Sequence, residues 1–181
     1  LHPLAQGYCH VYSSFFFSQL CLDQPARAYS YHNVRNWAKR ITGGDVFKLS
    51  VLLCPVNVNS VHWTLVSVNF LDHSIAYLDS LPDENTMGPL CVEAMQQYLL
   101  DEYRSSPREF PFPQWNVNAF APCPAQETSF DCGAFVCANM FRLSLAPTWS
   151  FSQQDMPRIR RAIGYTLLAP TAGFECYFNP D

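Results

Sequence analysis

Residues 61–80 read VHWTLVSVNFLDHSIAYLDS, and this stretch contains two strand-like runs joined by a short connection. The runs, 62–69 and 74–80, are rich in Val, Leu, Ile and Tyr, and Leu71-Asp72 lies at the centre of the connection. In the hairpin register that this centre sets, Asp79 lies opposite Thr64 and diagonal to His62, with Cα atoms ~7–8 Å apart. A slip of one residue would put His62 and Asp79 on opposite faces. The hairpin therefore predicts that an imidazole and a carboxylate meet.

The composition is that of a compact chain. It has 181 residues, of which 49% are hydrophobic and only 14% charged, so we expect one domain over residues 1–181. The net charge of -4 argues against nucleic acid as a partner. Residues 49–71 lack acidic and basic side chains, but Pro55, Asn57 and His62 make this stretch too polar for a membrane span. We therefore expect neither nucleic acid nor a membrane as a partner.

The first residues, Leu-His-Pro-Leu-Ala, do not contain a basic segment followed by a long apolar one. We therefore expect no secretory signal. Because the chain does not begin with Met, it is expected to be a domain excised from a longer protein.

Helical patterns flank the hairpin on both sides. Hydrophobic spacing, prolines at helix starts and glycines after helix ends predict helices over 11–22, 33–41, 89–103 and 132–145, and a last helix from Asp155 to about Leu167. A further strand is predicted over 46–54. Three arginines of the last helix, Arg158, Arg160 and Arg161, are expected to form a solvated face.

A candidate nucleophile precedes the apolar helix in Asp131-Cys132-Gly133. A thiol in the first turn of a helix lies near the positive end of the helix dipole, and this favours the thiolate. By itself, however, a cysteine at a helix start is usually structural. A nucleophile also needs a base and a group that orients the base, and His62 and Asp79 supply both. Gln126 and the backbone N–H of Cys132 could then stabilise an oxyanion.

The eight cysteines are expected to be reduced, because the domain is large enough to be stable without disulfides and several lie in apolar runs. Cys123, Cys132 and Cys137 are separated by nine and five positions, which does not match a zinc site. We therefore expect no metal and no cofactor.

Taken together, these motifs resemble the Ulp/SENP cysteine proteases, which cut after the carboxyl-terminal Gly-Gly of SUMO and related ubiquitin-like modifiers. The matching blocks are His62-Trp63 at a strand start, the Tyr-Leu-Asp-Ser of 77–80, Gln126 ahead of Asp131-Cys132-Gly133, and the tail FSQQDMPRIRRAI. The resemblance implies an α+β, papain-like fold with a mixed or antiparallel central sheet flanked by helices. The nucleophile would lie at the N-terminus of a buried helix.

The resemblance assigns Cys132 as nucleophile, His62 as base, Asp79 as its orienting acid and Gln126 as oxyanion donor. It also implies that Trp63 walls a narrow tunnel for the Gly-Gly tail. The family has a second tunnel tryptophan in a Trp-Leu-Asn-Asp stretch, where this chain has Gly7-Tyr8-Cys9-His10. Tyr8 is the candidate substitute for it. A monomeric catalytic domain, SUMO or another modifier as partner, and a nuclear or nucleocytoplasmic location are further expectations from the family.

Three alternatives stay open on the sequence. The chain could act on NEDD8 or ubiquitin, bind a ubiquitin-like protein without cutting it, or transfer acetyl groups from coenzyme A, as related bacterial effectors do. The complete set of His62, Asp79, Gln126 and Cys132 argues against a pure binding module. The chain has no basic cluster obviously placed for the phosphates of coenzyme A.

Overall fold

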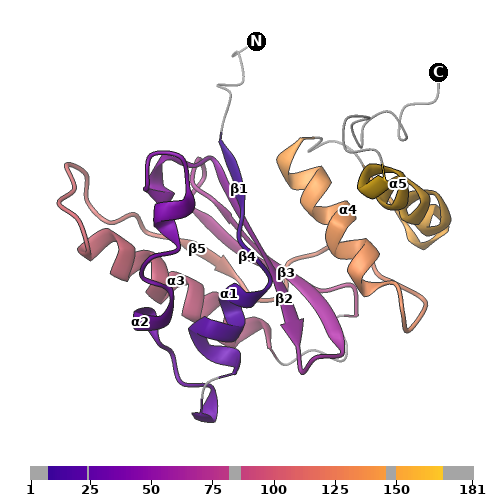
Figure 1. Cartoon of the computed structure of the whole chain (residues 1–181), viewed down its shortest axis with the longest axis horizontal. Coiled ribbons are helices and arrows are strands. Elements are labelled where there is room, and N and C mark those ends of the chain that lie inside the picture. The colour runs from indigo at the N-terminus through magenta and orange to yellow at the C-terminus, as the bar shows by residue number, and fades with distance from the viewer. Residues whose placement is uncertain (1–7, 24, 82–86, 146–149, 169–181) are drawn as a thin grey trace.

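The computed structural model describes residues 8–23, 25–81, 87–145 and 150–168. Its centre is a five-stranded mixed sheet in the order β1-β2-β3-β4-β5 (Figure 1). The strands are β1 (Cys9–Val11), β2 (Val51–Val58), β3 (His62–Asn69), β4 (Ser74–Leu78) and β5 (Asn116–Asn118). β2, β3 and β4 are antiparallel to one another, whereas β1 and β5 add in parallel at the two edges.

The longer helices are α3 (Gly88–Arg104), α4 (Cys132–Ser144) and α5 (Met156–Leu168). Short helical pieces fill the amino-terminal half and precede α5: α1 (Phe15–Phe17), η1 (Ser18–Leu22), η2 (Pro25–Arg27), α2 (Tyr31–Val34), η3 (Ala38–Arg40), η4 (Val46–Lys48) and η6 (Gln153–Asp155). The combination of a mixed sheet with helices on both sides confirms the expected α+β class.

The sheet is buried on both faces because β3 alternates its side chains between two cores. Val66 and Val68 pack into the larger core with α1, η1 and α3, while Leu65 packs into a second cluster with Val136 of α4. α4 therefore covers the opposite face from α3, and α5 packs against α4 (Figure 1). This arrangement places the start of α4 near the end of the sheet where β3 begins.

Two of the predicted amino-terminal helices are wrong in extent. The chain is still a strand at Val11, and the helical segment that follows is α1 and the π-helical η1. The predicted helix over 33–41 is two separate pieces, α2 and η3. Trp37 lies between these pieces and packs edge-on against Tyr12 and Phe16, with ring centroids 5.5 and 5.3 Å apart. Tertiary packing of aromatic rings has overridden helix propensity here.

The strand predicted over 46–54 is shifted. A 3-10 turn occupies Val46–Lys48, and β2 runs from Val51 through Pro55 to Val58. Proline is tolerated there because β1 pairs only as far as Leu53, so Pro55 lies beyond the last β1 pair. Among the described residues, no helix combines the length and apolar character that a bilayer span requires.

Candidate active site

The predicted hairpin register is confirmed. β3 and β4 pair Leu65 with Leu78 and Val66 with Tyr77, and the same alignment continued by one residue places Asp79 opposite Thr64. Asp79 follows β4 directly, and its Oδ1 lies 2.7 Å from Nε2 of His62, the first residue of β3. The backbone N–H of Leu81 also donates to this oxygen at 2.8 Å. Two donors therefore hold the Asp79 carboxylate toward the imidazole.

The imidazole of His62 lies between Asp79 and the thiol of Cys132. The hydrogen bond to Asp79 raises the pKa of His62, burial acts in the opposite direction, and a hydrogen bond with the Cys132 thiol adds to the increase. Since Nε2 is occupied by Asp79, Nδ1 is the ring nitrogen left for the sulfur. Cys132 is the first residue of α4 and is 7% exposed. The structure thus brings together three residues that the sequence analysis placed in one site.

Trp63 lies beside the same helix start. Its side chain is half-buried against the cluster that contains Leu65 and Val136. A Cβ added to Gly133 would lie 3.7 Å from Cδ1 of Trp63. The indole therefore borders the first turn of α4, which begins with Cys132.

Gln126 is buried, and both ends of its amide are already bonded. Ser80 donates its hydroxyl to Oε1 at 2.6 Å, and Nε2 donates to the Thr128 carbonyl at 2.5 Å. The backbone N–H of Gln126 also bonds the Ser80 carbonyl at 2.9 Å. One N–H of the amide remains for another acceptor. The sequence analysis expected the amide to swing into place, whereas the structure holds it in one orientation.

The loop between Gln126 and Cys132 is bonded to the carboxyl-terminal part of the chain. Buried Asp131 accepts hydrogen bonds from Thr128, Gln153 and Arg160 at 2.6, 2.8 and 2.6 Å. Burial by itself would raise the pKa of Asp131, but these three hydrogen bonds and the positive charge of Arg160 hold it below its usual value. Arg160 was predicted to belong to a solvated face. It is half exposed, but it also pairs with the buried Asp131.

One protein family matches most of the chain. The Ulp1 protease family, C-terminal catalytic domain, matches residues 5–169. The chain belongs to this family. Sentrin-specific protease 5 of Homo sapiens is 34% identical over 154 residues, which cover 85% of this chain and 19% of that protein. The putative ubiquitin-like-specific protease 1B of Arabidopsis thaliana is 30% identical, over 84% of this chain and 43% of that protein. The chain thus spans less than half the length of these relatives.

Solved structures of the Ulp1 family have the same fold. The C-terminal Ulp1 protease domain in complex with Smt3, the yeast ortholog of SUMO, superposes with a TM-score of 0.75 at 28% identity. The superposition covers 91% of this chain and 70% of that one. A structure of Ulp1 with its catalytic cysteine oxidised to a sulfinic acid superposes with a TM-score of 0.74, also at 28% identity, covering 90% of this chain and 69% of that one.

For this member of the Ulp1 family, the placement expected of Tyr8 is wrong. Its carbonyl accepts a hydrogen bond from Ser50, so it lies at the start of β2, whereas Trp63 pairs with Asn57 near the other end. Six residues of strand separate Val51 from Asn57, a distance of about 20 Å. The side chain of Tyr8 is 68% exposed at that far end. β1 pairs in parallel with the near end of β2, and this long-range pairing carries Tyr8 away from the site.

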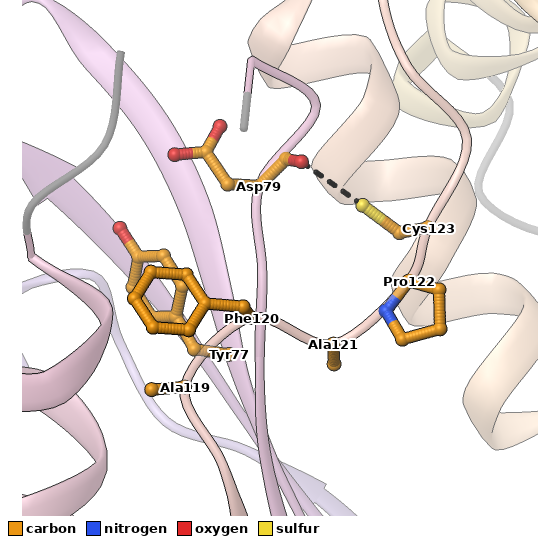
Figure 2. A pocket seen from close by; sticks show the side chains of 7 residues that line it. All are labelled: Tyr77, Asp79, Ala119, Phe120, Ala121, Pro122 and Cys123. Atoms are coloured by element: carbon orange, nitrogen blue, oxygen red, sulfur yellow. Dashed lines mark hydrogen bonds between the residues drawn. The ribbon is translucent and has the colours of Figure 1, made fainter. Parts of the chain in front are cut away.

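A small cavity of about 120 Å³ lies behind the acid of this Ulp1-family site (Figure 2). Its walls include Tyr77, Phe120 and Cys123, and the Cys123 thiol donates to the Asp79 carbonyl at 3.1 Å. Burial raises the pKa of Cys123 to about 11, so this thiol stays protonated and can donate. The cavity is well below the 300–1,000 Å³ usual for cofactor sites. The cavity lies against the segment that carries Asp79.

The three cysteines weighed as metal ligands serve different purposes in this Ulp1-family fold. Cys123 bonds the Asp79 backbone, Cys132 faces His62, and Cys137 lies partly buried on α4. In the part of the chain that the structure describes, no three His, Cys, Asp or Glu side chains gather closely enough to hold a metal ion. All seven described cysteines are free thiols.

The sequence analysis missed Ser80, Thr128, Gln153 and the bonding of Arg160. Ser80 had a usable signal, because it directly follows Asp79 where the strand enters the site. Gln153 lies in the 3-10 helix η6 and Arg160 in the α-helix α5 that follows it. Their spacing in sequence did not reveal that both side chains would meet the same loop.

Proposed function

We propose that this chain is a cysteine protease that hydrolyses the peptide or isopeptide bond after the C-terminal Gly-Gly of SUMO. The observation that carries the proposal is the His62 imidazole held between the Asp79 carboxylate and the Cys132 thiol. A nucleophile, a base and an orienting acid in that order are the components of thiol-based acyl transfer. Cys132 and Asp79 are both buried, which limits the access of water to the thiol and to the carboxylate.

In this mechanism His62 accepts the proton of the Cys132 thiol, and the thiolate attacks the carbonyl carbon of the terminal glycine. The C–N bond then breaks, and His62 donates the proton to the leaving amine. That amine is a lysine ε-amine in deconjugation or a peptide amine in precursor processing. A thioester remains on Cys132. Water, activated by His62, hydrolyses it and frees the modifier and the enzyme.

Negative charge develops on the glycine carbonyl oxygen during both steps. We assign its stabilisation to the backbone N–H of Cys132 and to the side-chain amide of Gln126. The hydroxyl of Ser80 supports this role because it fixes Oε1, so that the NH2 end is the end available to a substrate oxygen. Such preorganised donors do not need to reorient during the reaction.

Selection of glycine would depend on Trp63. Only glycine lacks a Cβ, so an extended Gly-Gly passes through a channel that larger residues cannot enter. The position of the indole beside Gly133 supports a wall of this channel immediately next to the thiol. With Tyr8 at the far end of β2, the opposite wall must come from other residues.

SUMO is favoured over other modifiers by the family relationship. The human relative is a sentrin-specific protease, and the superposed Ulp1 domain is bound to the yeast ortholog of SUMO. Proteases for NEDD8 or ubiquitin, a non-catalytic binder and an acetyltransferase are the other outcomes of the test.

The test is covalent labelling by SUMO whose C-terminal glycine carries an electrophile. We expect labelling of the wild-type chain and none of Cys132→Ser, with Cys137→Ser as the matched control on the same helix. Probes built on ubiquitin and NEDD8 should label weakly or not at all. Labelling by one of them in preference to SUMO would reassign the modifier. SUMO binding without labelling, or transfer of an acetyl group from coenzyme A, would contradict the protease proposal.

A further inference from the structure

The loop that carries both proposed oxyanion donors is held by the carboxyl-terminal helical segment. The Glu127 backbone N–H donates to Oε1 of Gln153 at 2.9 Å. Nη2 of Arg160 donates to the Phe130 carbonyl at 2.7 Å, and its guanidinium lies 5.8 Å from the exposed Phe130 ring. The segment from Gln126 to Cys132 is therefore bonded at both of its ends to η6 and α5.

Asp131 is the centre of this bonding. It is 3% exposed, and each of its carboxylate oxygens has a partner on a different element. Oδ1 accepts from Nε of Arg160, while Oδ2 accepts from Thr128 and Gln153. The carboxylate thus bonds outward to α5 and η6, although its backbone begins α4: the Asp131 carbonyl accepts the Phe135 N–H at 3.0 Å.

The position of this carboxylate has an electrostatic consequence. Without a paired cation, a buried negative charge on the residue before the nucleophile would oppose formation of a thiolate, since like charges repel more strongly away from water. Arg160 is the cation paired with that charge. The charged groups on the elements around Asp131 and Cys132 are His62, Asp79, Glu127, Arg142, Asp155, Arg158, Arg160 and Arg161. Within that group Arg158 pairs with Asp155 at 3.6 Å, and only Arg160 reaches Asp131.

We propose that Arg160 is a positioning residue of the active site: through Asp131 and the Phe130 carbonyl it fixes the 126–132 loop and neutralises the negative charge beside Cys132. The helix α5 is then a part of the active site although it contributes no group to the chemistry. This inference rests on the proposed role of Cys132 as the reacting thiol. It does not depend on which modifier the enzyme cuts.

The test measures the reaction of Cys132 with iodoacetamide between about pH 5 and pH 9, followed at the Cys132 peptide by mass spectrometry. In Arg160→Gln, we expect alkylation near neutral pH to slow on the order of 3- to 10-fold and the whole profile to move to higher pH. The effect stays modest because the Arg160 side chain is 48% exposed and solvent screens its charge. Arg161→Gln, an exposed arginine on the same helix, is the matched control and should react as the wild type does.

Two further variants separate charge from packing. Adding Asp131→Asn to Arg160→Gln removes the uncompensated charge and should return the profile toward that of the wild type. Arg160→Lys keeps the charge, so its pH profile should coincide with that of the wild type. If circular dichroism shows that Arg160→Gln does not fold, the pH profile of Arg160→Lys is the test. The proposal is overturned if Arg160→Gln reacts like Arg161→Gln, or if it is slower by the same factor at every pH and Asp131→Asn does not restore it. Because iodoacetamide needs no modifier, this outcome is independent of the probe labelling that tests the proposed function.

Discussion

Nε2 of His62 and Oδ1 of Asp79 lie 2.7 Å apart although 17 positions separate the two residues in the chain. The contact exists because β3 and β4 pair in a register that puts both side chains on one face. The carboxylate is almost fully buried, so its charge acts on the imidazole with little screening by water. Substitution at this pair should therefore change the chemistry of the site strongly.

Asp79→Asn should lower kcat by roughly 10²- to 10⁴-fold, because the imidazole loses the charge that orients it and stabilises its protonated form. Since the bond to Asp79 is the main cause that raises the pKa of His62, the limb of the pH–rate profile that reports His62 should move to lower pH. Steady-state cleavage of a SUMO fusion measures both effects. Asp72→Asn, in the turn of the same hairpin, should behave as the wild type. If the limb that reports His62 stays in place, Asp79 does not control the protonation of His62.

The same pair makes stability depend on pH. The pKa of His62 is raised in the folded chain above its usual value of about 6.5, so folding favours the protonated ring. The stabilisation is fully present below the unfolded pKa and is lost as the pH rises through the folded pKa. In urea unfolding, the free-energy difference between the wild type and His62→Gln should therefore be larger at pH 5.5 than at pH 8.5. A difference that grows with pH would contradict this sign.

The bond between Ser80 and Gln126 should matter for turnover and not for binding. Gln126→Ala removes the proposed oxyanion donor and should lower kcat by roughly 10²- to 10³-fold with little change in KM. Ser80→Ala removes the bond to Oε1 but leaves the bond from Nε2 to the Thr128 carbonyl, so we expect a smaller loss, on the order of 3- to 10-fold, in kcat. Ser144→Ala, whose hydroxyl bonds the backbone at the other end of α4, is the control. A large rise in KM with unchanged kcat in Gln126→Ala would assign this residue to substrate binding instead.

The sequence predicted the site better than it predicted the amino-terminal half of the fold. The His62–Asp79 pairing depends on one hairpin whose two strands and connection are adjacent in sequence, so their alternation was enough to set the register. Cys132 was recognisable because a helix start is a local feature. These are the parts of the molecule where structure follows from neighbouring residues.

The misplaced features depend on contacts between distant segments. Tyr8 directly precedes β1, and the parallel pairing of β1 with β2 places Tyr8 at the far end of β2. No local pattern in the sequence indicates this pairing. Arg160 bonds Asp131 although 29 positions separate them, and no sequence pattern near either residue indicates the contact. Pro55 would have ended a strand paired on both sides, but β1 is too short to reach it. Long-range packing, which periodicity does not encode, decided each of these three cases.

Gly88, the first residue of α3, provides a test of that packing. A Cβ there would lie 2.1 Å from the carbonyl oxygen of Ala119 and 3.4 Å from the Tyr77 ring, so backbone would have to move. Gly88→Ala should therefore lower the free energy of unfolding by about 1–3 kcal/mol. Gly164→Ala is the matched control in α5. Nothing lies within 4 Å of its added Cβ, and the better helix propensity of Ala should stabilise the chain by up to about 1 kcal/mol. Urea unfolding of both variants measures these changes. Equal stability of Gly88→Ala and the wild type would mean that α3 does not contact the Ala119 segment as it does in the structure.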